Sequence, residues 1–257
     1  MPPPLITAHA ACRGHAPENT LAGVRAALDL GADAIEIDVR CTRDGMPVLL
    51  HDATVDRTTD GEGDLAALSL RQARRLHTSD GERIPTLKET LQAVAGRALL
   101  VLEVKPTDIE EAVLEAVRKA GALDWCAVHS FRPQVVERVR TLEPRLPCLL
   151  LTAGREVVNW GQLFSFALSL GAQGIAVHHG ALTPELVRSA HLRDLRVSTW
   201  TVNRQADVRR AAACGVDAIT SDYPDRVRRW LPKRGATAAA LVPPAKRRWR
   251  RTEGPPG

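Results

Sequence analysis

A short corner recurs three times along this chain: a glycine follows a helix-like apolar pattern and opens a strand-like run. The three copies lie at Gly31–Asp38, Gly171–His178 and Gly215–Asp222. Glycine suits the residue just past a helix, because a left-handed backbone costs it nothing. Recurrence of this corner at wide intervals predicts a fold built from repeated strand and helix units.

The rest of the chain keeps the same alternation. Further strand-like runs lie at Leu5–His9, Pro47–His51, Ala98–Lys105, Cys126–Ser130, Pro147–Thr152 and Arg196–Val202. Helical patterns lie at Thr20–Leu30, Leu87–Ala95, Ile109–Ala120, Gln134–Leu142, Val157–Leu170, Pro184–Ala190, Gln205–Cys214 and Pro224–Leu231. Asn19 or Thr20 would cap the first helix. Over 257 residues, this alternation predicts an α/β protein with a closed (β/α)8 architecture, the TIM barrel.

Two segments depart from this rhythm. Residues 52–85 are rich in Asp, Thr and Gly and contain a short helical pattern at Leu70–Leu76, so we expect an insertion over one end of the barrel. Residues 233–257 are rich in Ala, Pro and Arg and have no apolar period. We therefore expect a barrel domain over 1–232 and a disordered basic tail after it.

The positive charge belongs to that tail. The chain has a pI of about 9.2, but seven of its 35 basic residues and one of its 30 acidic residues lie in 233–257. The barrel domain is left with 28 basic and 29 acidic residues, which argues against nucleic acid as its partner. For the tail, a solvated segment and a weak contact with an anionic membrane are both open.

Cysteine content and hydropathy bear on the compartment. The five cysteines have no CxxC spacing, so neither a disulfide framework nor a zinc site is indicated. The first residues show no basic start followed by an apolar run, and no stretch approaches the ~20 apolar residues of a membrane span. We expect a cytoplasmic protein.

Acidic residues come at the ends of two predicted strands. Glu36 and Asp38 are two residues apart, so they share one strand face, and Glu103 and Lys105 repeat the pattern. Apolar residues fill the other face, which packs on helices in a barrel, so these side chains point inward near the rim where barrel enzymes place their sites. Three carboxylates suit Mg²⁺ or Ca²⁺, whereas an ion pair with Lys105 and no metal is the alternative.

Two histidines also end strand-like runs, His9 and His51. Imidazole titrates near neutrality, so two such groups on one barrel rim could act as general acid and base. A hydrogen-bonded structural role is the alternative for either residue taken singly. Among the other six histidines, only His178 ends a strand and could line the pocket.

Several motifs, in this order, are similar to those of the glycerophosphodiester phosphodiesterase family. They are His9, Pro17-Glu18-Asn19-Thr20, Gly31–Asp38 with Thr42-Arg43-Asp44-Gly45, His51-Asp52, Asp56-Arg57-Thr58-Thr59, Ile84–Leu87, Glu103–Pro106, Ser130-Phe131, Trp200–Asn203 and Gly215–Pro224. The resemblance spans about residues 5 to 231. The spacing of His-Asp and Arg-Thr-Thr is specific, whereas the Gly-Val-Asp corner alone is weak.

The resemblance implies an activity and a role for each residue. It implies hydrolysis of lipid-derived glycerophosphodiesters to an alcohol and glycerol phosphate, by attack of a glycerol hydroxyl and opening of a cyclic phosphate by water. Glu36, Asp38 and Glu103 would hold one divalent cation, Mg²⁺ or Ca²⁺. His9 and His51 would be the acid and base. Lys105 would contact the phosphate, and Trp200 would line the substrate pocket unless it only packs in the core.

The chain departs from the family beside His9. The family has Arg and then Gly after this histidine, where this chain has Ala10 and Ala11. A rival alignment places Arg13 and Gly14 on that pair but puts Cys12 on the histidine; we prefer His9, which directly ends an apolar run. Loss of the arginine removes a phosphate contact, which Arg13 on the same loop could replace. A barrel that binds a phosphodiester but cleaves it poorly is therefore the alternative function.

Overall fold

Eight parallel strands close into a barrel in the computed structural model, which describes residues 3–231. The barrel strands are β1 (Leu5–Ala8), β2 (Ala34–Cys41), β4 (Leu99–Val104), β5 (Cys126–Ser130), β6 (Cys148–Thr152), β7 (Gly174–His178), β8 (Arg196–Trp200) and β9 (Ala218–Ser221). They follow the order β1-β9-β8-β7-β6-β5-β4-β2, and a further pairing of β1 with β2 closes the ring. The predicted TIM barrel is confirmed.

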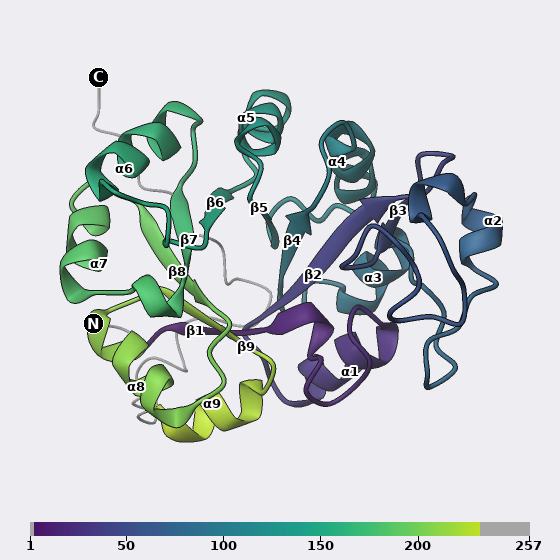
Figure 1. Cartoon of the computed structure of the whole chain (residues 1–257), viewed down its shortest axis with the longest axis horizontal. Coiled ribbons are helices and arrows are strands. Elements are labelled where there is room, and N and C mark those ends of the chain that lie inside the picture. Colours follow the sequence, from purple (N-terminus) through teal and green to yellow (C-terminus); the bar gives the residue numbers. More distant parts are fainter. Residues whose placement is uncertain (1–2, 232–257) are drawn as a thin grey trace.

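Helices surround this barrel as an outer ring (Figure 1). They are α1 (Leu21–Asp29), α3 (Leu87–Val94), α4 (Glu110–Lys119), α5 (Pro133–Leu142), α6 (Trp160–Ser169), α7 (Pro184–His191), α8 (Gln205–Cys214) and α9 (Pro224–Trp230). Thr20 is the N-cap of α1, since its side chain accepts a hydrogen bond from the Gly23 amide. Gly215 ends α8 with a left-handed backbone (φ 86°), the role predicted for the corner glycines.

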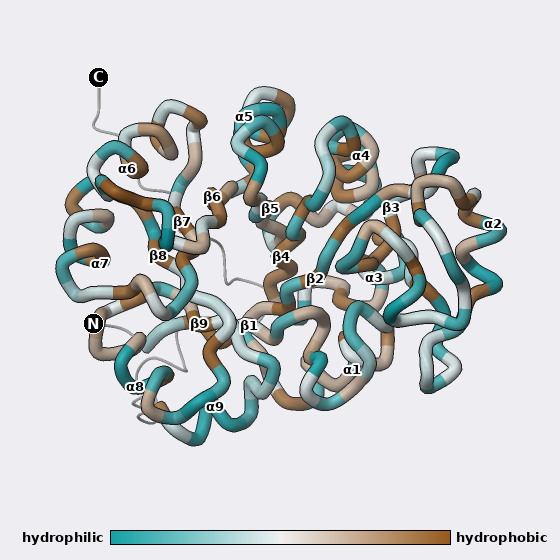
Figure 2. Tube along the Cα trace, viewed as in Figure 1, coloured by the Kyte–Doolittle hydropathy of each residue, from teal (hydrophilic) through white to brown (hydrophobic). Residues whose placement is uncertain are grey.

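The apolar core lies between the strands and these helices. On β2, the outward side chains Ile35, Ile37 and Val39 are fully buried in it, which leaves the alternate side chains for the barrel interior. The strands and the helix faces turned toward them are the most hydrophobic parts of the trace (Figure 2). In the barrel, β2 and β4 pair in register, so Asp38 lies opposite Glu103. This register brings together the acidic residues of two strands.

The segment expected as a strand at Pro47–His51 differs from the prediction. A turn at Gly45 (φ 74°) reverses the chain, so β3 (Pro47–Leu49) pairs antiparallel with β2 and is not a barrel strand. His51 follows β3 by two residues. The inserted segment continues with η2 (Leu65–Ala67) and α2 (Leu70–Ala73), beside β2 and α3 (Figure 1).

The inserted segment has a small core of its own. It consists of Val48, Leu50, Val55, Leu65, Ala73 and Ile84. Over residues 3–231, no helix is long and apolar enough to cross a membrane. The expected tail, 233–257, lies outside the described residues.

Candidate active site

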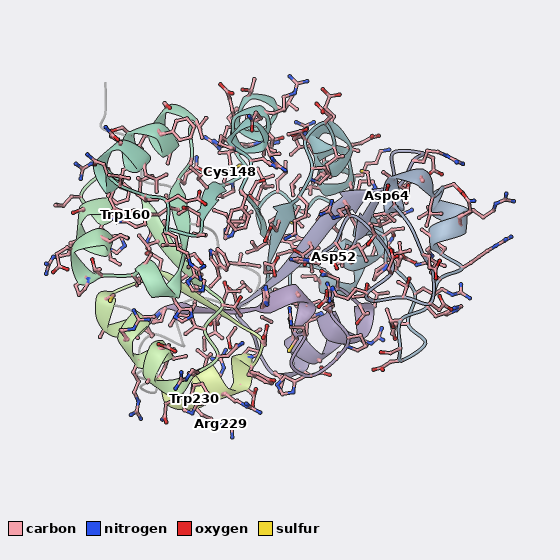
Figure 3. All side chains as sticks on the ribbon, in the orientation of Figure 1. Asp52, Asp64, Cys148, Trp160, Arg229 and Trp230 are labelled. Atoms are coloured by element: carbon pink, nitrogen blue, oxygen red, sulfur yellow. The ribbon has the colours of Figure 1, made fainter. Side chains whose placement is uncertain are left out.

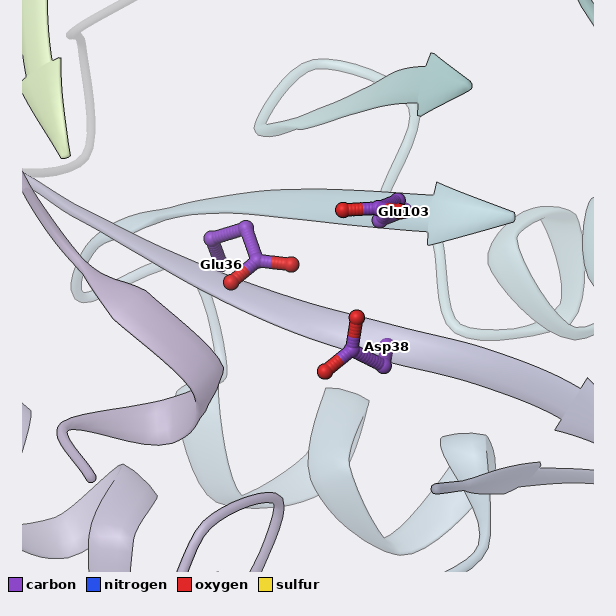
Figure 4. A group of neighbouring side chains, drawn as sticks. All are labelled: Glu36, Asp38 and Glu103. Carbon is purple, nitrogen blue, oxygen red and sulfur yellow. The ribbon is translucent and has the colours of Figure 1, made fainter. Parts of the chain in front are cut away.

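Three carboxylates meet inside the barrel, two from β2 and one from the neighbouring strand β4. One oxygen each of Glu36, Asp38 and Glu103 lies within 4.8 Å of the others (Figure 4). Glu36 and Asp38 are 5% and 1% exposed, and Oε1 of Glu36 is buried without a hydrogen-bond partner. Buried carboxylates at this spacing need a cation, and hard oxygen ligands suit a divalent metal ion.

Asn19 holds Asp38 from the loop after β1. Its amide nitrogen donates to Oδ2 of Asp38 at 2.7 Å, and its amide oxygen accepts from the Asp38 backbone N–H at 2.9 Å. The backbone of Asn19 is left-handed (φ 57°), a conformation that asparagine tolerates better than most residues. Of the two candidates for the cap of α1, Asn19 therefore serves the acidic group, while Thr20 is the cap.

Lys105 lies between two of the carboxylates. Its Nζ is 2.8 Å from Oδ1 of Asp38 and 2.5 Å from Oε1 of Glu103. Burial opposes the charged form of Lys105, but these two carboxylates outweigh it and raise the lysine pKa. Burial also opposes ionisation of Asp38, yet Lys105 and the Asn19 amide lower its pKa. Lys105 thus forms an ion pair with two of the three carboxylates that could hold a metal ion.

Glu36 lies farther from the lysine and behaves differently. Burial and the charge of Asp38 raise the pKa of Glu36 to about 8, although His9 acts in the opposite direction. Burial likewise raises the pKa of Glu103. Without a cation, the barrel thus favours a protonated carboxyl on Glu36. A divalent ion would displace that proton, because a carboxylate ligand must be ionised.

His9 follows β1 directly and faces Glu36. Its Nδ1 donates to Oδ1 of Asp222 at 2.7 Å, and its Nε2 lies 4.0 Å from Oε2 of Glu36. Burial disfavours the imidazolium, but the bond to Asp222 and the charge of Glu36 outweigh it and raise the His9 pKa. Asn203, from the loop after β8, donates to the other oxygen of Asp222 at 2.7 Å. His9 is therefore held in one orientation, with Nε2 toward the acidic group.

The turn after His9 has a left-handed backbone at three consecutive non-glycine residues. Their φ angles are 44° for Ala10, 55° for Ala11 and 69° for Cys12. This conformation costs about 1–2 kcal/mol per residue. It directs the Ala10 amide at Oε2 of Glu36, at 2.7 Å. Cys12 is fully buried, and burial raises its thiol pKa to about 12. The side chain that faces the acidic group is that of His9, whose Nε2 lies 4.0 Å from Glu36.

His51 is oriented by its neighbour in the sequence. Its Nδ1 donates to Oδ1 of Asp52 at 2.6 Å, and Arg57 of the inserted segment donates from Nε to the other Asp52 oxygen at 2.5 Å. The hydrogen bond from Arg57, aided by His51, lowers the Asp52 pKa to about 2. Asp52 is on the side of the inserted segment that faces the strands, whereas Asp64 is farther out (Figure 3). Both predicted acid–base histidines are thus bonded through Nδ1 to a carboxylate.

Ion pairs connect the two histidines along the rim. Arg57 Nη2 lies 2.6 Å from Oε1 of Glu18, and Arg13 Nη1 lies 3.7 Å from the other Glu18 oxygen. Arg13 Nε is 3.6 Å from Oδ1 of Asp222. The series runs through His9, Asp222, Arg13, Glu18, Arg57, Asp52 and His51. Arg13, half exposed, therefore reaches the rim beside His9.

Aromatic side chains form another part of the rim. The ring of Trp200 lies edge to face with Phe131 at 5.5 Å and with His178 at 5.3 Å. Its indole N–H donates to the Ala176 carbonyl at 3.1 Å. Phe131 is 44% exposed. Trp200 thus belongs to an open apolar wall as well as packing against the barrel.

Several residues in or beside this site are not among the site residues predicted from the sequence. They are Asn19, Asp52, Arg57, Asn203, Asp222 and His129. The first five lie in motifs of the resemblance, so their position was a usable signal. His129 lies in none of these motifs. It is on β5, and burial lowers its pKa to about 3.

Comparison with known proteins agrees with this geometry. The model of the Glycerophosphoryl diester phosphodiesterase family matches residues 9–226. A glycerophosphodiester phosphodiesterase of Caldanaerobacter subterraneus is 33% identical over 244 residues, covering 90% of this chain and 99% of that protein.

Solved structures show the same fold. A glycerophosphoryl diester phosphodiesterase structure from Silicibacter pomeroyi has a TM-score of 0.81 at 29% identity, over 89% of this chain and 93% of that one. A phosphodiesterase of Oleispira antarctica, in complex with the product sn-glycerol-3-phosphate, has a TM-score of 0.80 at 27% identity, over 89% and 96%. With its barrel, its carboxylate group and these matches, the chain belongs to the glycerophosphodiester phosphodiesterase family.

Proposed function

We propose that this chain hydrolyses glycerophosphodiesters to an alcohol and glycerol phosphate at the rim formed by β1, β2 and β4. The observation that carries the proposal is a group of three carboxylates, two of them buried, between two histidines. Each histidine is oriented by a carboxylate of its own. Membership of the family and the product-bound relative from Oleispira antarctica support the substrate class.

Glu36, Asp38 and Glu103 are the residues that would hold one divalent cation, Mg²⁺ or Ca²⁺. The unpartnered Oε1 of Glu36 fits this assignment, because a buried carboxylate oxygen without a donor is costly unless it binds an ion. A bound cation would stabilise negative charge on the non-bridging phosphate oxygens. Lys105 would then pair with the phosphate instead of bridging Asp38 and Glu103.

His9 and His51 move the protons. Since Nδ1 of each ring donates to a carboxylate, Nε2 is the nitrogen left for catalysis. One ring accepts the proton of the attacking glycerol hydroxyl, and the other protonates the leaving alcohol. Water then opens the cyclic phosphate with the two roles reversed.

Arg13 and Trp200 complete the substrate site. Arg13 supplies the positive charge that the family's arginine would provide at residue 10. It lies on the same loop and reaches the rim beside Asp222. A charged hydrogen bond to phosphate contributes about 1.5–3 kcal/mol. Because Arg13 can provide this bond, we infer that the chain with alanine at residue 10 is active. Trp200 and Phe131 form the apolar wall for the leaving alcohol.

The test is release of choline or ethanolamine from glycerophosphocholine, glycerophosphoethanolamine or a lysophospholipid, with Mg²⁺, Ca²⁺ or Mn²⁺ and then with a chelator. We expect turnover that the chelator abolishes and that His51→Asn reduces at least about 100-fold. His77→Asn, in the inserted segment, is the control. Absence of turnover of every diester with all three metal ions would refute the proposal.

A further inference from the structure

His129 is a buried histidine that the proposed reaction does not use. It is 8% exposed, and its Nε2 has no hydrogen-bond partner. A buried polar atom without a partner destabilises a fold, so natural proteins rarely keep one unless it serves a function. Leucine has a similar size and would avoid the penalty at this position. The residue type at 129 therefore requires an explanation.

The place of His129 in the barrel suggests what it contacts. β5 pairs in register with β4, so His129 lies opposite Glu103 and, like it, points into the barrel. Adjacent strands are about 4.8 Å apart. Two residues further along the same face, Phe131 reaches the rim and contacts Trp200. His129 thus lies between the carboxylate group and the aromatic wall, the two parts of the site assigned to the substrate.

Its chemistry separates His129 from the metal site. The carboxylate group with mutually close ligand atoms consists of Glu36, Asp38 and Glu103, and His129 is not a member. The imidazole is uncharged in this surrounding, so one ring nitrogen donates and the other accepts. A hydroxyl group has the same pair of capacities. A phosphate oxygen only accepts, and a quaternary ammonium group does neither.

We propose that His129 is a specificity-determining residue that hydrogen-bonds the glycerol hydroxyl that does not attack phosphorus. The inference rests on the proposed function and adds to it the feature of the substrate that is recognised. Rotation of the ring about its Cβ–Cγ bond, a soft torsion, presents the nitrogen to the ligand. The site would then select a glycerol group against a diol of the same size that lacks this hydroxyl.

The test compares two substrates in three proteins. The substrates are sn-glycero-3-phosphocholine and its 1-deoxy analogue, 2-hydroxypropyl phosphocholine, which keeps the attacking hydroxyl. We expect the unmodified protein to prefer the glycerol substrate by at least about 100-fold in kcat/KM, because a site built for a hydroxyl strongly rejects an analogue without one. His129→Leu should lose this preference while changing turnover of the analogue less than about threefold. His129→Asn, which keeps a donor and an acceptor, should retain part of it.

Other results would overturn the inference. Equal loss for both substrates in His129→Leu, or weaker Mg²⁺ binding by calorimetry, would make His129 a support of the metal site instead. Equal use of both substrates by the unmodified protein would leave the proposed function intact and remove this role. If the protein turns over neither substrate, calorimetry with sn-glycerol 3-phosphate and 2-hydroxypropyl phosphate still decides the role of His129. Tighter binding of sn-glycerol 3-phosphate, with the difference abolished in His129→Leu, would support the inference. If His129→Leu does not fold, the comparison of the glycerol ligand with its 1-deoxy analogue in the unmodified protein decides whether the second hydroxyl is recognised.

Discussion

Arg13 Nε lies 3.6 Å from Oδ1 of Asp222, the same oxygen that accepts the hydrogen bond from His9 Nδ1. A guanidinium therefore lies on the same rim as His9, three residues beyond residue 10, the position at which the resemblance expects an arginine. The two positions differ in exposure: Ala10 is buried within the turn, whereas the side chain of Arg13 is half exposed. Variants at residue 13 and at residue 10 test which position can provide a phosphate contact.

Arg13→Ala should lower kcat/KM for glycerophosphocholine about 10- to 100-fold, because it removes a charged hydrogen bond to the phosphate. Arg13→Lys should recover part of the loss, since it restores charge without the bidentate geometry. Arg25→Ala, an exposed arginine on α1, is the matched control. Steady-state kinetics that leave Arg13→Ala unchanged would show that this arginine does not contact substrate.

Ala10→Arg should raise kcat/KM of the unmodified protein about 10-fold or more, for the same reason. The left-handed backbone at residue 10 is already borne by a non-glycine residue, so the substitution adds little backbone strain. In the double variant with Arg13→Ala, the new arginine should keep activity near the original level. A double variant no better than Arg13→Ala would mean that a side chain at residue 10 cannot reach the phosphate.

Affinity for Mg²⁺ should depend on pH through Glu36. The metal-free protein holds a proton on Glu36 with a pKa of about 8, against 4.5 for an ordinary glutamate. Below that pH the cation must displace the proton, so affinity should rise about tenfold per pH unit from pH 6 to 8. Isothermal titration calorimetry measures this slope. Glu36→Gln should bind Mg²⁺ weakly at every pH, whereas Asp64→Asn should behave as the unmodified protein.

The same shift has a consequence for stability without metal. A carboxyl whose pKa is higher in the folded state stabilises the fold below its unfolded pKa and loses that contribution as pH rises through the folded value. Metal-free protein should therefore lose stability between about pH 4.5 and pH 8. Urea unfolding at several pH values should show a shallower decline in Glu36→Gln. An identical decline in both proteins would contradict the assignment.

Lys105→Met should separate metal binding from phosphate binding. Without metal, the variant leaves Asp38 and Glu103 without their partner, and breaking a buried pair typically costs about 3–5 kcal/mol of unfolding free energy. Mg²⁺ should restore much of that stability, because the carboxylates are then free to bind it, while kcat/KM stays low. Thermal melts with and without Mg²⁺ measure this. Lys88→Met, on the exposed face of α3, is the control, and a variant that Mg²⁺ does not stabilise would refute the arrangement.

Gly23→Ala should destabilise the protein and impair the site. A methyl group at residue 23 would lie 2.0 Å from the carbonyl oxygen of Ala11. Relief of this clash must move the left-handed turn that directs the Ala10 amide at Glu36, at a cost of about 1–3 kcal/mol. Gly161→Ala in α6 meets only the Asn159 side chain at 3.2 Å, so its effect should stay within about 1 kcal/mol. Urea denaturation of both variants tests the contrast.

Much of the barrel followed from local pattern alone. The glycine corners, the apolar alternation of β2 and the helical periods depend on neighbours in the sequence, so they could be recognised without a structure. The place of β3 could not. A strand-like run looks the same whether it pairs parallel within the barrel or returns antiparallel along β2, and here the turn at Gly45 decides.

The acidic group likewise has features that the sequence predicts and features that depend on the fold. That Glu36 and Asp38 share one strand face could be predicted from their spacing, because side chains alternate along a strand. The partners of these two residues depend on how distant segments come together: the register of β4 supplies Glu103, and the loop after β1 supplies Asn19. Closure of β9 onto β1 likewise brings Asp222 to His9. His129 was hidden for this reason, since one histidine in an apolar strand has no local signal. That its Nε2 is buried without a hydrogen-bond partner can be recognised only in the closed barrel.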